Sequence, residues 1–170
     1  MQTPLVITLL GSDRSGLVKL LSEVVKNYNG NWQESRMVRM DGQFVGLAHV
    51  SVVSEQAEAL TQELLALQNN DLQILVKPTK TSASPTKTLS LELLGSDRQG
   101  IIHDITQQLT ALNINIEKLQ SEQRTAPMSN ETLFYAEVVL GLPEGITEDN
   151  VRAVFEEISD SLMVDVTFNA

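Results

Sequence analysis

The sequence contains no cysteine, and only 4% of its 170 residues are aromatic. Disulfide bonds, thiolate metal sites and cysteine nucleophiles are therefore excluded, and we expect cores built from Leu, Val and Ile. No apolar run reaches the roughly 20 residues that a membrane-spanning helix needs. The first four residues carry no positive side chain, so we predict no signal peptide and a cytoplasmic location.

Basic residues are also scarce, with 12 Lys and Arg against 22 Asp and Glu and a formal net charge of −10. Residues 1–86 hold 7 basic and 8 acidic residues, whereas residues 87–170 hold 5 and 14. A nucleic acid requires basic contacts to its phosphates, so we expect no direct binding to DNA or RNA. The acidic second half suits either a basic protein partner or simply a well-solvated surface.

What the chain does contain is an internal repeat. Residues 9–16 read Leu-Leu-Gly-Ser-Asp-Arg-Ser-Gly, and residues 93–100 repeat them 84 positions later with Gln99 in place of Ser15. An apolar run precedes each copy and an amphipathic helical pattern follows it. We therefore predict two similar units, each organised around a strand-to-helix turn.

Hydrophobic periodicity predicts the same β-α-β-β-α-β order in both units. In the first unit we expect strands at residues 5–10, 31–40, 43–53 and 72–77, with helices after Gly16 and from Ser54. Asp41-Gly42 predicts a tight hairpin turn. In the second unit, strands are expected at residues 89–93, 115–124, 132–140 and 162–168, and Thr147 is expected to cap the last helix.

We therefore predict an α+β protein of two ferredoxin-like βαββαβ domains, each a four-stranded antiparallel sheet with two helices on one face. The first domain spans residues 1–77 and the second spans residues 88–170. Residues 78–87 contain two prolines and small polar residues, which is typical of a linker.

The sequence offers little for catalysis. The repeated turn has the glycine spacing of a phosphate-binding loop, but Leu17 and Val18 stand where that motif needs Lys and a hydroxyl group. The only two histidines, His49 and His103, do not recur in the other copy. We predict no catalytic residue, no metal site and no cofactor, and hence no enzyme.

The repeated turn permits two interpretations. The positive end of the following helix could bind a small anion such as a carboxylate, with Gly16 and Gly100 letting the ligand approach the backbone. Alternatively, these glycines serve packing, and Asp13 and Asp97 cap the helices.

Each unit resembles the ACT domain. The resemblance rests on the Gly-Ser-Asp-Arg-x-Gly turn, the aliphatic helix after it, and the Asn that begins the next strand. The usual turn of the family is Asp-Arg/Lys-Pro-Gly, and Ser15 and Gln99 replace its proline. Two free-standing copies, covering essentially the whole chain, are most similar to regulatory proteins of the glycine cleavage system transcriptional repressor family.

The resemblance implies that a ligand, often an amino acid, binds at an interface between domains, against the turn and the start of the second strand. Turn N–H groups would bind its carboxylate and Asp its ammonium group, so glycine or a similar small amino acid is the expected effector. By position, the implied ligand-binding residues are Ser12, Asp13, Gly16, Leu17 and Asn31 in the first unit, and Ser96, Asp97, Gly100, Ile101 and Asn115 in the second.

The resemblance further implies a non-catalytic regulator of transcription in glycine cleavage or amino-acid metabolism. It would act through a protein partner such as a DNA-binding activator, and it would form a homodimer. Two alternatives stay open: a protein-interaction module without a ligand, and a regulatory subunit of an enzyme of amino-acid metabolism.

Overall fold

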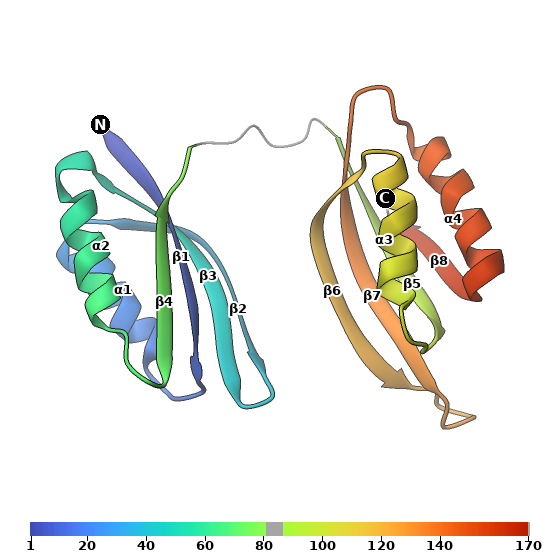
Figure 1. Cartoon of the computed structure of the whole chain (residues 1–170), viewed down its shortest axis with the longest axis horizontal. Helices are drawn as coiled ribbons and strands as arrows, with labels where there is room; N and C mark the ends of the chain where they lie inside the picture. Colours follow the sequence, from blue (N-terminus) through green and yellow to red (C-terminus); the bar gives the residue numbers. More distant parts are fainter. Residues whose placement is uncertain (81–86, 170) are drawn as a thin grey trace. The chain divides into compact units, whose positions relative to one another are not determined.

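The computed structural model describes residues 1–80 and 87–169, and the chain divides into two compact units, Met1–Ser82 and Ala83–Ala170 (Figure 1). The first unit contains β1 (Gln2–Ser12), α1 (Leu17–Asn27), β2 (Asn31–Met40), β3 (Gln43–Val53), the short 3₁₀ helix η1 (Ser54–Gln56), α2 (Ala57–Ala66) and β4 (Leu72–Pro78). The second contains β5 (Lys87–Ser96), α3 (Ile101–Ala111), β6 (Asn115–Thr125), β7 (Thr132–Leu142), α4 (Glu148–Leu162) and β8 (Val164–Asn169).

Each unit is built on one antiparallel sheet, with strand order β2-β3-β1-β4 in the first unit and β6-β7-β5-β8 in the second. Figure 1 shows α1 and α2 on one face of the first sheet and α3 and α4 on one face of the second. The predicted fold class, two ferredoxin-like βαββαβ units, is therefore confirmed.

The two cores follow from alternation along the central strands. Leu5, Ile7 and Leu9 of β1 are buried against the helices, while the residues between them lie on the other face. The same holds for Leu89, Leu91 and Leu93 of β5, as predicted. From the helical side, α1 contributes Leu17, Leu21, Val24 and Val25, and α3 contributes Ile101, Ile105 and Leu109.

The predicted hairpin turn at Asp41-Gly42 and the predicted helix cap at Thr147 are both confirmed. Asp41 and Gly42 both have positive φ, 47° and 77°, and they join β2 to β3 with Met40 opposite Gln43. Such a turn matches the right-handed twist of the strands that it connects. Thr147 caps α4, as predicted.

The structure corrects several boundaries. The first strand runs from Gln2 to Ser12 rather than over residues 5–10, because its polar ends pair with β3 along their whole length. The last strand begins at Val164 rather than at residue 162, because α4 continues to Leu162 and is followed by its C-cap, Met163, with φ 51°. Ser54 begins a 3₁₀ turn, and the α-helix follows from Ala57.

The predicted linker falls mostly on residues 81–86, which lie outside the described residues; Pro78 and Lys87 at its ends belong to strands. Within the described part of the chain, no helix is long and apolar enough to cross a membrane.

Candidate functional site

The two repeated turns have the same backbone geometry. Gly16 lies at the N-terminus of α1 with φ 92° and ψ −2°, and Gly100 lies at the N-terminus of α3 with φ 82° and ψ 3°. This left-handed conformation is costly for residues with a Cβ atom. No atom lies within 4 Å of where a Cβ would stand at either glycine. The glycines are therefore required by the backbone conformation, and a Cβ atom at either position would meet open space.

Each turn leads directly into the start of a helix. The first N–H groups of an α-helix have no intrahelical partner, and the helix dipole gives this end a partial positive charge. Neither Gly16 nor Gly100 supplies a side chain to satisfy these donors. Both turns can therefore donate hydrogen bonds to a small anion.

Backbone hydrogen bonds fix each turn to the rest of its sheet. The N–H of Ser12 donates to the carbonyl of Asp71 (3.0 Å), and that of Asp13 donates to the carbonyl of Gly42 (2.9 Å). In the second unit, the N–H of Asp97 donates to the carbonyl of Thr132 (3.1 Å). The donors at the start of each helix are thus held on a rigid support.

The alternative interpretation, in which Asp13 and Asp97 cap the helices, is wrong, because both carboxylates contact a neighbouring strand instead. Asp13 Oδ2 lies 2.9 Å from Nε of Arg39 on β2, and Asp97 Oδ2 accepts a hydrogen bond from Nε2 of Gln123 on β6 (2.6 Å). Sequence reasoning missed both partners. Arg39 and Gln123 are 84 positions apart, so they occupy equivalent positions in the two repeats, but only the folded structure brings them to the turns.

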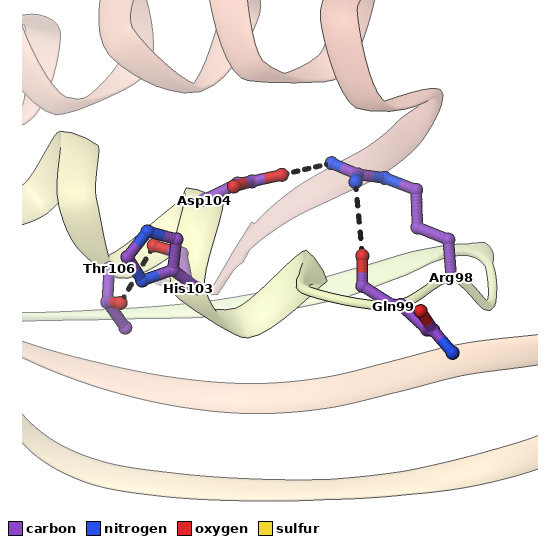
Figure 2. A network of polar contacts seen from close by, with 5 residues as sticks. All are labelled: Arg98, Gln99, His103, Asp104 and Thr106. Atoms are coloured by element: carbon purple, nitrogen blue, oxygen red, sulfur yellow. Dashed lines mark hydrogen bonds and ion pairs between the residues drawn. The ribbon is translucent and has the colours of Figure 1, made fainter.

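The arginines of the two turns differ in their environment. Arg98 donates to Asp104 Oδ2 (2.6 Å) and, more weakly, to the carbonyl of Gln99 (3.5 Å), as Figure 2 shows. The position equivalent to Asp104 in the first unit is Leu20, and among the described residues Arg14 forms no ion pair or hydrogen bond. The guanidinium group of Arg14 in the first turn is therefore unpaired, whereas that of Arg98 in the second turn is neutralised by Asp104.

The two asparagines do not join the turns of their own units. Ser12 lies opposite Gln43, but Asn31 lies opposite Ser51, eight residues further along β3, which is about 27 Å at about 3.4 Å per residue. Asn115 lies at the corresponding far end of the second sheet, opposite Gly141, and donates to Glu117 Oε1 (2.6 Å). Within a unit, the predicted grouping of turn and asparagine is therefore not formed.

The remaining predicted residues divide between surface and core. Ser12 is exposed, and Ser96 donates its hydroxyl hydrogen to Glu131 Oε1 (2.9 Å). Leu17 and Ile101 are buried in the two cores, so only their backbones can contribute to a site at the turns.

A shallow depression of about 180 Å³ lies elsewhere, between α4 and β8. At its edge the guanidinium of Arg152 covers the Phe168 ring at 4.0 Å and pairs with Glu148. Among the described residues, no three His, Asp or Glu side chains are grouped so that they could hold a metal ion.

Strand order, helix placement and the paired glycine turns define two similar ferredoxin-like βαββαβ units, and comparison with known proteins shows what the chain is similar to. Residues 3–77 match the ACT domain family. Over 97% of its length the chain is 26% identical to the glycine cleavage system transcriptional repressors of Escherichia coli (strain K12) and Shigella flexneri, covering 88% of each. The resemblance inferred from the repeated turn is therefore confirmed.

One solved structure is similar in fold over nearly the full length of the chain. The crystal structure of an unknown protein from Galdieria sulphuraria superposes with a TM-score of 0.85 at 25% identity, covering 99% of this chain and 98% of that chain.

Proposed function

We propose that this chain is a non-catalytic, cytoplasmic regulator of transcription in glycine cleavage or amino-acid metabolism, which senses a small amino acid such as glycine. Its similarity to two glycine cleavage system transcriptional repressors over nearly its full length supports this proposal. The observation that carries it is the first turn, which combines the uncapped N-terminus of α1 with two charged residues adjacent in the sequence, Asp13 and Arg14, the latter unpaired among the described residues.

The first turn has the groups that an amino acid requires. The N–H donors of α1 and Arg14 attract a carboxylate, and charge-assisted hydrogen bonds of this kind are the stronger ones. Asp13 supplies a negative charge for the ammonium group. Its carboxylate already has Arg39 as a partner, but this ion pair is solvent-exposed on the Arg39 side, and such pairs are weak enough to rearrange.

The second turn is a poorer site for the same ligand. Asp104 occupies the first turn of α3 and engages Arg98, so it both removes a cation and adds an anion near the helix N-terminus. We therefore propose that effector binding resides mainly in the first unit.

The second unit is better suited to a protein partner, such as a DNA-binding activator. The charged side chains of its turn already have partners, since Arg98 pairs with Asp104 and Asp97 accepts a hydrogen bond from Gln123. Residues 87–170 also carry most of the negative charge of the chain. We propose that the chain does not bind DNA itself, since that would require basic contacts to phosphate, and that it forms a homodimer. An interaction module without any ligand is the second candidate, and the satisfied second turn favours it.

The test is calorimetric titration of the purified chain with glycine, serine and other small amino acids, together with thermal shift. We expect saturable binding and a Tm that rises with ligand concentration. Arg14→Gln should weaken binding by roughly tenfold or more, because a hydrogen bond to a charged group contributes about 1.5–3 kcal/mol.

Arg98→Gln is the matched control and should leave affinity nearly unchanged. Chemical-shift mapping should place the ligand at residues 12–18 and not at the depression between α4 and β8. Absence of binding across the panel would contradict sensing and favour the interaction module. Equal losses in the two arginine variants would contradict the assignment to the first unit.

A further inference from the structure

The face of the first sheet that α1 and α2 leave uncovered is rich in exposed apolar side chains. In β1, β3 and β4 the alternating neighbours of these residues are buried or half-buried against the helices, and strand pairing places Val38 and Met40 of β2 on the same face. Five of these residues are 40–61% exposed: Leu10, Val38, Met40, Leu47 and Leu75. We call this surface the open face of the first sheet.

Strand register makes these residues contiguous. One row across the sheet runs Gln73, Leu10, Val45 and Val38, and the adjacent row runs Leu75, Thr8, Leu47 and Arg36. The next row ends in charged residues, with Lys77 on β4 at one edge and Glu34 on β2 at the other. The face is thus an apolar patch with Lys77 at the β4 edge and the ion pair of Glu34 and Arg36 at the β2 edge.

The corresponding face of the second sheet shows that the fold does not require this apolar surface. At the positions of Leu47, Val38 and Thr8 it carries Glu137, Glu122 and Glu92. There Tyr135 donates a hydrogen bond to Glu137 (3.1 Å), and its partial burial together with this carboxylate raises the tyrosine pKa. Contiguous exposed apolar patches of this kind mark interaction sites.

We propose that the open face of the first sheet binds the same face of a second copy of this chain, sheet against sheet. This proposal specifies the surface of the homodimer proposed above, and it rests on that part of the proposed function. A two-fold axis parallel to the strands places β4 of one copy over β2 of the other and keeps each row opposite itself.

Charge complementarity argues for a second copy as the occupant. In this arrangement Lys77 faces Glu34 of the second copy at both ends of the row, and Leu10 faces Val45 of the second copy. Glu34 already pairs with Arg36 (2.7 Å), whereas Lys77 has no ion pair among the described residues. Two aligned sheets pack face to face about 10 Å apart in this manner in β-sandwiches.

The size of the face agrees with the proposal. Four strands about 4.8 Å apart and about 10 residues long cover roughly 650 Å², and side-chain relief increases that area. A stable interface buries about 800 Å² per partner. One sheet face is therefore sufficient, without a contribution from other elements.

The experiment measures oligomeric state by sedimentation velocity and light scattering over a range of concentrations. Leu10 and Leu94 occupy equivalent positions and are 41% and 38% exposed. We expect a dimer for the wild type and for Leu94→Glu, and at least a tenfold weaker dimer for Leu10→Glu. Leu47→Glu should act like Leu10→Glu, and the second sheet already tolerates Glu137 at that position.

Two further variants test the register of the two copies. Lys77→Glu should weaken the dimer, and adding Glu34→Lys should restore it. Circular dichroism and urea unfolding verify that each variant remains folded.

A dimer that survives both Leu10→Glu and Leu47→Glu would overturn the proposed face while leaving a homodimer in place. A monomeric wild type at all concentrations would overturn the homodimer as well, and another part of the same chain or a different protein would then be the occupant. Neither result depends on whether an amino acid binds.

Discussion

At the residue scale, the glycines of the repeated sequence have two distinct roles. Gly16 and Gly100 adopt positive φ with open space around them, so their requirement is conformational. Gly11 and Gly95 precede them in ordinary strand conformation, but a Cβ there would lie 2.7 Å from the carbonyl oxygen of Asp71 or of Met163. Their requirement is close packing of strand against backbone.

Substitutions at Gly16 and Gly11 should therefore follow different rules. Gly16→Ala should lower the free energy of unfolding by about 1–2 kcal/mol, and Gly16→Asn by less, because Asn tolerates the left-handed region. At Gly11, Asn should cost at least as much as Ala, since any Cβ displaces the Asp71 carbonyl. Urea unfolding of the four variants measures this, and equal losses for Ala and Asn at Gly16 would contradict the conformational role.

At the element scale, helices α1 and α3 begin differently from α4. The caps of α1 and α3 are glycines without a side-chain hydrogen bond, which leaves their N–H groups available. Helix α4 begins with a reciprocal capping box: Asn150 N–H donates to Thr147 Oγ1 (3.4 Å), and Thr147 N–H donates to Asn150 Oδ1 (2.9 Å). The helices that carry the candidate turns lack the caps that α4 uses for stability.

Removing the cap of α4 should destabilise the second unit. We expect Thr147→Ala to lower its free energy of unfolding by about 1 kcal/mol, within the range of 0.5–2 kcal/mol that such caps contribute. Thr147→Ser keeps the accepting oxygen and should remain close to wild type. Hydrogen exchange of the first turn of α4, followed with urea unfolding, measures the effect. Similar exchange in the Ala and Ser variants would show that the cap contributes little.

At the scale of the whole molecule, each unit has a complete hydrophobic core of its own. One cluster of buried residues extends from Leu5 to Ile74 and the other from Leu89 to Val164, and they share no member. The formal charge is divided just as sharply, at −1 for residues 1–86 and −9 for residues 87–170. Two similar folds therefore carry surfaces of different charge. This difference agrees with the proposal that the first unit binds the effector and the second unit binds a protein partner.

Separate cores predict separate folding. Fragments 1–82 and 83–170, expressed individually, should each give a cooperative thermal transition and dispersed amide resonances. Glycine should bind to the first fragment if effector sensing resides there. An unfolded fragment 83–170 would show that the second unit depends on the first for its stability.

Much of this architecture was predictable from the sequence, because the relevant signals are local. The repeated turn, alternation in β5, the Asp41-Gly42 hairpin and the Thr147 cap are each encoded within a few residues, and together they determined two βαββαβ units. The repeat also indicated that Gly16 and Gly100 have a role in the turns, because both copies keep glycine at this position.

Only the tertiary structure decided which side chains meet. Strand register separates Asn31 from the first turn and places Arg39 beside Asp13, and the repeat position of Leu20 leaves Arg14 free where Asp104 engages Arg98. Register also gathers Leu10, Leu47 and Leu75 on one open face. Such groupings depend on pairing between strands that are distant in the chain, whereas periodicity within a strand reports only which face a residue occupies.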